Sequence, residues 1–149
     1  MAGFALTSPS FAEGGAIPSK FTCDGQNVSP ALDWEGAPAQ AAAFALIVDD
    51  SDARGFVHWV AFDIPGGTRG SLPEGVPAGG PPLQGRTSFG KGGYGGPCPP
   101  SGVHHYHFTL YALSALLNLG SSATADDLRR AMSGKVLGQT SLTGTYRRG

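Results

Sequence analysis

Three segments of the chain are rich in β-branched and aromatic residues and are bounded by glycine, proline or aspartate: residues 43–50 (AFALIVDD), 56–64 (FVHWVAFDI) and 104–113 (HHYHFTLYAL). This composition is typical of β-strands. The first segment is apolar on both faces until Asp49, which is the pattern of a central strand covered on both sides. The sequence therefore predicts a mainly β protein built around these three strands.

Residues 4–8 (FALTS), 31–34 (ALDW) and 140–146 (TSLTGTY) favour strands more weakly. The stretch from residue 65 to residue 100 consists mostly of glycine, proline and small polar residues, and we expect it to be a long loop. Structureless loops of that length are uncommon in compact domains and are often functional.

One helix is well indicated, over residues 125–132 (ADDLRRAM). Thr124 can cap its N-terminus, and Asp126 and Asp127 in the first turn suit the positive end of the helix dipole. We expect this helix to be structural and to have no chemical role.

The length of 149 residues fits a single domain over residues 1–149, which can bury a core without a metal or a disulfide. The 24 glycines and 12 prolines are interleaved with apolar runs, so they indicate turns in a loop-rich β protein rather than disorder. The formal net charge of -1 gives no basic surface of the kind that binds nucleic acid.

The N-terminal sequence MAGFALTSPSFAEGG lacks the basic and long apolar regions of a secretory signal, and the apolar run at residues 41–48 is too short to span a bilayer. We therefore expect a cytoplasmic protein without membrane insertion. Cys23 and Cys98 lack the spacing of a redox or zinc motif, so we expect two reduced thiols. A disulfide between two loops is the alternative, and it depends on the separation of the two Cα atoms.

Side-chain alternation predicts which histidines of the segment 104–113 act together. His104 and Tyr106 share one face of the strand, and His105 and His107 share the other. The three histidines are therefore not one cluster.

Further polar groups lie near the ends of the other two strong strands. Asp50 and Asp52 lie where one strand ends and a turn begins, and alternation in the next strand puts His58 opposite to Trp59. Strand ends beside loops often carry binding groups. The alternative is a turn capped by aspartates and histidines with ordinary structural hydrogen bonds.

Two chemical alternatives have weaker support. A zinc site would use Asp50, His58, His104 and His105. Adjacent histidines on a strand point to different faces, which disfavours it. A serine hydrolase would need an activated nucleophile, for which Ser101 is the nearest candidate, but the chain has no G-x-S-x-G motif.

The segments VDDSDA and GFVHWVAFDIP, followed by GYGGPCPPSGVHHYHFTLYAL, resemble the two signatures of the phosphatidylethanolamine-binding protein family. The segment FTCDGQNVSPALDWEGAP and the closing GQTSLTGTYRR are similar to its bacterial and archaeal Raf-kinase-inhibitor-like branch. The resemblance covers nearly the whole chain. It implies a β-sandwich-like fold with a large central antiparallel sheet, a smaller sheet and one or two short helices near the C-terminus.

The resemblance also implies a small pocket at one end of the fold, which in relatives binds phosphate, phosphorylethanolamine, acetate or similar anions without a metal or a cofactor. Carried over to this chain, its lining would be Asp50, His58, Trp59, Pro99, Pro100, His104 and Tyr106. Where the family's first signature usually has proline, this chain has Ser51 and Arg54, so we expect a less rigid loop there.

The residue types of this pocket suit an anion. Imidazoles at His58 and His104 and the hydroxyl of Tyr106 can donate hydrogen bonds to an oxyanion. Asp50 can orient a histidine or accept the ammonium group of ethanolamine. Because histidine changes charge near neutrality, we expect phosphate to bind more tightly near pH 6 than near pH 8.

No lysine or arginine lies inside the matched pocket motifs, although Arg54, Arg86 and Lys91 are loop residues that can reach in. The leading hypothesis is a non-catalytic, Raf-kinase-inhibitor-like binding protein for a small anion or a phosphorylated partner. A kinase or a protease is the candidate protein partner, and a homodimer is left open. One alternative is a phosphoester hydrolase or lyase that uses Asp50, His58 and His104. The other is a serine protease inhibitor that acts through the loop around Lys91.

Overall fold

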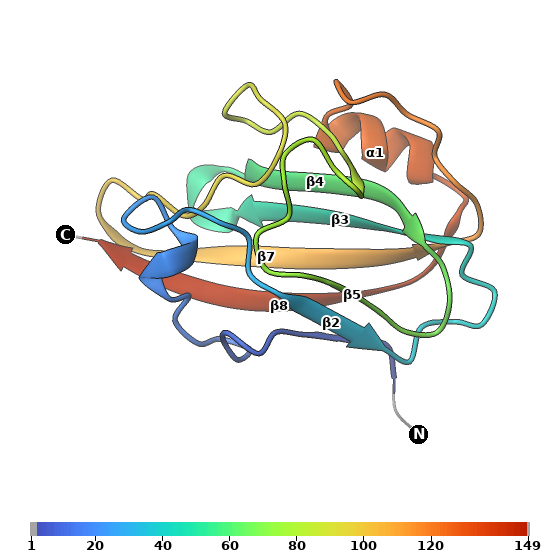
Figure 1. Ribbon diagram of the computed structural model, residues 1–149, viewed down its shortest axis with the longest axis horizontal. Helices are drawn as coiled ribbons and strands as arrows, with labels where there is room; N and C mark the ends of the chain where they lie inside the picture. Colours follow the sequence, from blue (N-terminus) through green and yellow to red (C-terminus); the bar gives the residue numbers. More distant parts are fainter. Residues whose placement is uncertain (1–2, 149) are drawn as a thin grey trace.

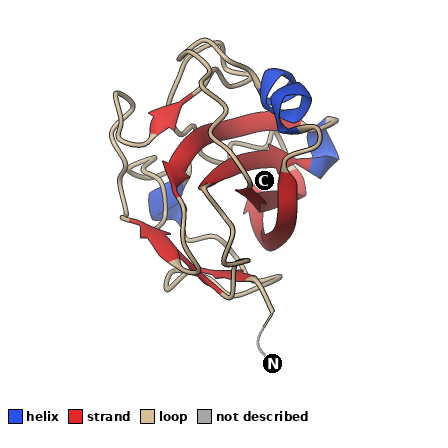
Figure 2. Ribbon diagram, turned by 90° about the vertical axis from the view of Figure 1, so that its right-hand side faces the viewer, coloured by secondary structure: helices blue, strands red, loops and turns tan. Residues whose placement is uncertain are grey.

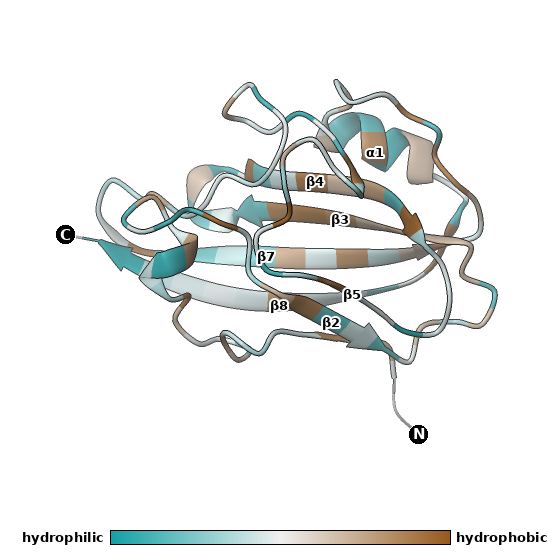
Figure 3. Ribbon diagram, in the orientation of Figure 1, coloured by the Kyte–Doolittle hydropathy of each residue, from teal (hydrophilic) through white to brown (hydrophobic). Residues whose placement is uncertain are grey.

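Strand β3 (Ala43–Asp50) lies at the centre of a five-stranded antiparallel sheet in the computed structural model, which describes residues 3–148 (Figure 1). The order of the large sheet is β6-β4-β3-β7-β8. The other strands are β4 (Phe56–Pro65), β6 (Leu83–Gln84), β7 (Gly102–Leu113) and β8 (Val136–Arg148). Residues 43–48 of β3 are all buried, which confirms the prediction of a strand covered on both sides. In Figure 3, β3 and β4 are mostly coloured as hydrophobic, whereas β8 at the edge of the sheet has mostly intermediate colours.

A small three-stranded sheet covers one face of the large sheet. It has the order β1-β2-β5, with β1 (Ala5–Thr7), β2 (Leu32–Glu35) and β5 (Gly70–Leu72). Apolar side chains of the small sheet, among them Trp34, form one buried cluster with Phe44 and Leu46 of β3. The indole of Trp34 meets the ring of Phe44 edge-on at 5.4 Å between centroids. Burial of these facing apolar surfaces holds the two sheets together.

Helix α1 (Ala125–Met132) packs against the other face of the large sheet (Figure 2). Leu128 and Met132 form a second buried cluster with Ile47 and Phe62. The helix has the predicted bounds, and Thr124 forms a full capping box with Asp127. No helix within residues 3–148 is long and apolar enough to cross a membrane.

The fold class is confirmed, with differences in the weaker elements. Strand β8 runs over residues 136–148 rather than 140–146, because it pairs with β7 along almost its whole length. The stretch 65–100 is not structureless, since it contains β5 and β6. Short 3-10 helices occur at Ser19–Phe21 (η1) and at Ser51–Ala53 (η2).

Candidate functional site

A cavity of about 220 Å³ lies where β3 ends and β7 begins, and we call it the Tyr106 cavity. Its lining consists of Asp50, Ala53, Phe56, His58, Phe89, Cys98, Pro99, Pro100, His104 and Tyr106. The structure thus brings together six of the seven residues that the resemblance implied for a pocket. This volume lies below the range of about 300–1,000 Å³ that is usual for small-molecule sites, so it suits a ligand no larger than a small anion.

Asp50 and His104 form a buried hydrogen-bonded pair in the wall of the cavity. The Nδ1–H of His104 donates to Asp50 Oδ2 at 2.6 Å, and the backbone N–H of Asp52 donates to Asp50 Oδ1 at 2.8 Å. Asp50 is 3% exposed and stands opposite Tyr106 in the β3–β7 register. The carboxylate therefore fixes the orientation of the imidazole, and the second ring nitrogen, Nε2, is left for a ligand.

His58 reaches the cavity because of a β-bulge. Val48 pairs with Trp59 and Asp49 pairs with Val57, so His58 is the extra residue between two register positions. A bulge interrupts the alternation of faces. His58 and Trp59 consequently both lie on the side of the small sheet, which corrects the expectation that they face opposite ways.

Trp59 does not line the Tyr106 cavity, contrary to the prediction from the resemblance. Its side chain is fully buried in the core, and its indole N–H donates to Gln84 Oε1 at 2.8 Å. Its ring also packs edge-on against Tyr94. Trp59 therefore supports the wall from behind and has no surface to offer a ligand.

The tautomer of His58 follows from its hydrogen bond to the backbone. Its Nδ1 lies 2.7 Å from the carbonyl oxygen of Gly95, which can only accept, so the proton is on Nδ1. Burial lowers the pKa of His58, and the bond to the Gly95 carbonyl offsets this only in part. A neutral His58 therefore presents its Nε2 as an acceptor, which corrects the expectation that this imidazole donates to the ligand.

Tyr106 supplies the donor. It is 1% exposed, and its hydroxyl makes no hydrogen bond of ordinary length to a described residue, although the Asp50 carboxylate lies close enough to interact with it. Burial, and then the charge and the hydrogen-bonding interaction of the nearby Asp50 carboxylate, raise the pKa of Tyr106, so the hydroxyl keeps its proton. Its ring lies 5.2 Å from that of His58 and 6.4 Å from that of His104. An unpartnered buried hydroxyl is unusual, and it is satisfied when a ligand brings an acceptor.

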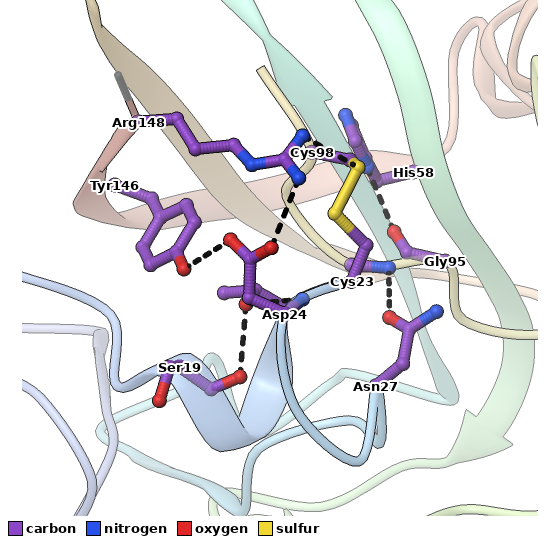
Figure 4. Close-up of a disulfide and its surroundings, with 11 residues drawn as sticks. Ser19, Cys23, Asp24, Asn27, His58, Gly95, Cys98, Tyr146 and Arg148 are labelled. Atoms are coloured by element: carbon purple, nitrogen blue, oxygen red, sulfur yellow. Dashed lines mark hydrogen bonds and ion pairs between the residues drawn. A yellow bond between two sulfur atoms is a disulfide. The ribbon is translucent and has the colours of Figure 1, made fainter. Parts of the chain in front are cut away.

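The remaining wall comes from the loop before β7 (Figure 4). Cys98 is joined to Cys23 by a disulfide with a Cα–Cα separation of 5.4 Å, so the expectation of two reduced thiols is wrong. Figure 4 also shows Tyr146 and Arg148 of β8 reaching Asp24, next to the bridge. The Cys98 end of the loop is thus tied to the turn that follows η1.

The other polar residues around this strand end lie elsewhere. His105 donates to the Asp52 carboxylate, and this hydrogen bond lowers the pKa of Asp52. His107 contacts Ser51 and Thr143. These residues are absent from the lining of the Tyr106 cavity, as the predicted alternation of the histidines requires.

The basic loop residues do not reach the Tyr106 cavity as the sequence had suggested. Arg54, Arg86 and Lys91 do not line the Tyr106 cavity, and the two arginines line a separate cavity instead. Phe56 and Phe89 also line the cavity and were not predicted from the sequence; their rings meet edge-on at 4.9 Å between centroids. Phe56 could have been found, because it opens the strand that carries His58, whereas the loop of Phe89 gives no pattern.

The described residues around the Tyr106 cavity do not form a metal-binding site. Within residues 3–148, no group of three or more histidine, cysteine, aspartate or glutamate side chains could hold one. His105 contributes nothing to the Tyr106 cavity. The cavity therefore offers one donor hydroxyl, two imidazoles held by hydrogen bonds, one carboxylate and apolar walls.

Comparisons with known proteins agree on one family. A family model described as phosphatidylethanolamine-binding protein matches residues 7–147. A protein from Methanothermobacter thermautotrophicus, named UPF0098 protein, is 50% identical over 150 residues, which cover 97% of this chain and 99% of the relative. The crystal structure of a family homologue from Chlamydia trachomatis matches with a TM-score of 0.90 at 32% identity, over 100% of both chains. The YbcL protein of E. coli, described as a new member of the mammalian family, matches with a TM-score of 0.90 at 30% identity, over 99% of this chain and 100% of that one.

Proposed function

Because the chain belongs to the phosphatidylethanolamine-binding protein family, we propose that its Tyr106 cavity binds a small phosphate monoester, with phosphorylethanolamine as the model ligand, and does so without catalysis. The observation that carries the proposal is the buried Tyr106 hydroxyl without a partner. A phosphate oxygen is the kind of strong acceptor that this donor needs.

The charges in the cavity select the protonation state of the ligand. The lining contains the carboxylate of Asp50 and no lysine or arginine, so a phosphate dianion would meet a like charge without a fixed cation. A singly protonated phosphate instead donates its P–OH to the Nε2 acceptor of His58 while another oxygen accepts from Tyr106. Because the second pKa of a phosphate monoester is about 6, this monoanion is abundant near pH 6 and scarce near pH 8.

The same groups argue for binding rather than turnover. Ser101 is not part of the lining, and the raised pKa of Tyr106 makes its hydroxyl a poor nucleophile. Asp50 accepts hydrogen bonds from His104 and from the backbone N–H of Asp52. These bonds fix the orientation of both side chains, and neither side chain is positioned to attack a phosphorus atom. A small anion therefore occupies the cavity as a ligand and leaves unchanged.

The proposal is tested by NMR titration of the labelled protein with phosphorylethanolamine and with inorganic phosphate, at pH 6 and at pH 8. We expect saturable shifts of the Asp50, His104 and Tyr106 resonances, stronger at pH 6. His104→Ala should lose most of the affinity, and His105→Ala, one residue away on the other face, should keep it.

Two binding results would overturn the proposal. The first is the absence of saturable shifts at these resonances in the wild-type protein. The second is an equal loss of affinity in the two histidine variants, which would indicate a general effect of removing an imidazole. In the same samples, phosphorus NMR should show phosphorylethanolamine intact, and the release of inorganic phosphate would disprove a non-catalytic role.

A further inference from the structure

A second cavity, of about 400 Å³, is lined by three arginines and lies beside the N-terminus of α1, and we call it the arginine cavity. The arginines come from three separate parts of the fold. Arg54 is in the turn between η2 and β4, Arg86 follows β6, and Arg129 is on α1. All three arginines are exposed to solvent, and a cleft lined by charges of one sign attracts ions of the opposite sign.

One of the three arginines, Arg129, is paired with carboxylates. Arg129 lies 3.1 Å from Asp126 and 3.5 Å from Asp49, and both carboxylates line the cavity. Among residues 3–148, the guanidinium groups of Arg54 and Arg86 make neither an ion pair nor a hydrogen bond. Three positive groups therefore face two negative ones, and the excess positive charge belongs to the two arginines without partners.

Neutral donors are also present in this lining. The Ser88 oxygen accepts from the backbone N–H of Val57 at 2.8 Å, and the Thr124 oxygen accepts from Asp127 at 3.2 Å, so each hydroxyl proton is free to donate outward. Guanidinium groups bind phosphate through paired N–H···O contacts, which is a stronger arrangement than single neutral donors provide.

We propose that the arginine cavity binds the phosphate group of a small phosphorylated molecule through Arg54 and Arg86, with the Ser88 and Thr124 hydroxyls as secondary donors. Arg129 is held back by its two carboxylates and shapes the cavity. The site is separate from the Tyr106 cavity, and neither site requires the other to be functional.

The size of the cavity limits the class of ligand. A volume of about 400 Å³ is in the range of small-molecule sites, which begins near 300 Å³. The low net charge of the chain already argues against a nucleic acid. A small phosphorylated metabolite is therefore the expected occupant.

The test is an NMR titration at pH 7.5 with glycerol 3-phosphate and with inorganic phosphate, against sodium chloride of equal ionic strength. We expect saturable shifts of the Gly55, Val57 and Ser88 amides with both phosphates and not with chloride. Arg54→Gln combined with Arg86→Gln should weaken this binding by roughly tenfold or more, because two charge-assisted contacts are lost. Arg147→Gln removes the same charge from exposed β8, lines neither cavity, and should change the affinity less than twofold.

Each other outcome counts against the proposal. Shifts that chloride reproduces, or that the Arg147→Gln variant loses equally, would reduce the effect to general electrostatic attraction. Binding that survives in the double arginine variant would place the phosphate elsewhere. A response to glycerol 3-phosphate confined to Asp50, His104 and Tyr106 would leave the Tyr106 cavity as a ligand site and disprove the arginine cavity.

Discussion

Asp49 and Asp50 are consecutive residues of β3, and they line two different cavities, Asp50 the Tyr106 cavity and Asp49 the arginine cavity. The two-residue period of a strand produces this division, because neighbouring side chains point to opposite faces of a sheet. The turn that follows repeats it, with Ala53 in one lining and Arg54 in the other. Substitutions at this strand end can therefore be assigned to one cavity or the other.

Tyr106→Phe should separate binding from stability. The change removes the unpartnered hydroxyl and leaves the buried ring, so the free energy of unfolding should stay within about 1 kcal/mol of the wild type or increase. The affinity for phosphorylethanolamine should fall roughly tenfold, because a hydrogen bond to a charged group is lost. Calorimetric titration and chemical denaturation measure the two quantities. An unchanged affinity would mean that the hydroxyl does not face the ligand.

His58 should make stability depend on pH. Burial lowers its pKa in the folded protein, so between that value and the ordinary value of about 6.5 the unfolded chain binds more protons than the folded one. The free energy of unfolding should therefore rise with pH in this window. His58→Gln, which cannot titrate, should show a flatter dependence in urea denaturation. A slope equal to that of the wild type would assign the effect to other groups.

The sequence predicted the central strands well because burial and alternation coincide there. The segment 43–50 is apolar on both faces up to Asp49, and the structure gives β3 the predicted bounds. Alternation also placed His104 and Tyr106 on one face. It failed at His58 and Trp59, because a bulge adds one residue and no local pattern marks it.

The remaining differences depend on contacts between distant segments. Strands β5 and β6 have three and two residues, and they are strands because β2 and β4 offer hydrogen-bonding partners. The pairing of Cys23 with Cys98, and the placement of Arg54 and Arg86 around another cavity, likewise follow from the complete fold. Composition and spacing contain no signal for either.

Gly96→Ala should disturb the wall of the Tyr106 cavity. A Cβ at this position would meet the Phe21 carbonyl oxygen and, at 2.5 Å, the Asn27 side-chain oxygen, which accepts from the Gly96 N–H. We expect a loss of stability of about 1–3 kcal/mol, as in overpacked sites, together with weaker binding of phosphorylethanolamine. Gly79→Ala is the matched control, because a Cβ there meets nothing within 4 Å. Equal thermal stability of the two variants would refute the close packing of the wall.

The disulfide anchors a part of the cavity wall, residues 98–101, that lacks the hydrogen bonds holding the preceding residues. Residues 94–97 are held by hydrogen bonds to His58, Phe21, Asn27 and Cys23. Within the described part of the chain, residues 98–101 make no backbone-to-backbone hydrogen bond outside the sheet. The bond from Cys23 and a contact of Arg148 with the Cys98 sulfur, at 3.5 Å, are the anchors of this segment.

Cys23→Ser combined with Cys98→Ser should therefore loosen the Pro99 and Pro100 wall. The bridge spans 75 residues, and the loop-entropy model gives it a stabilisation of about 4 kcal/mol, which thermal and urea denaturation can measure. Affinity for phosphorylethanolamine in the Tyr106 cavity should fall, and phosphate shifts at Gly55 and Ser88 in the arginine cavity should persist. Reductant added to the wild type should reproduce both effects. Because cytosolic reductants keep most thiols reduced, the cytoplasmic location expected from the sequence would then favour the weaker-binding form. Unchanged binding in the double variant would show that the wall is held without the bridge.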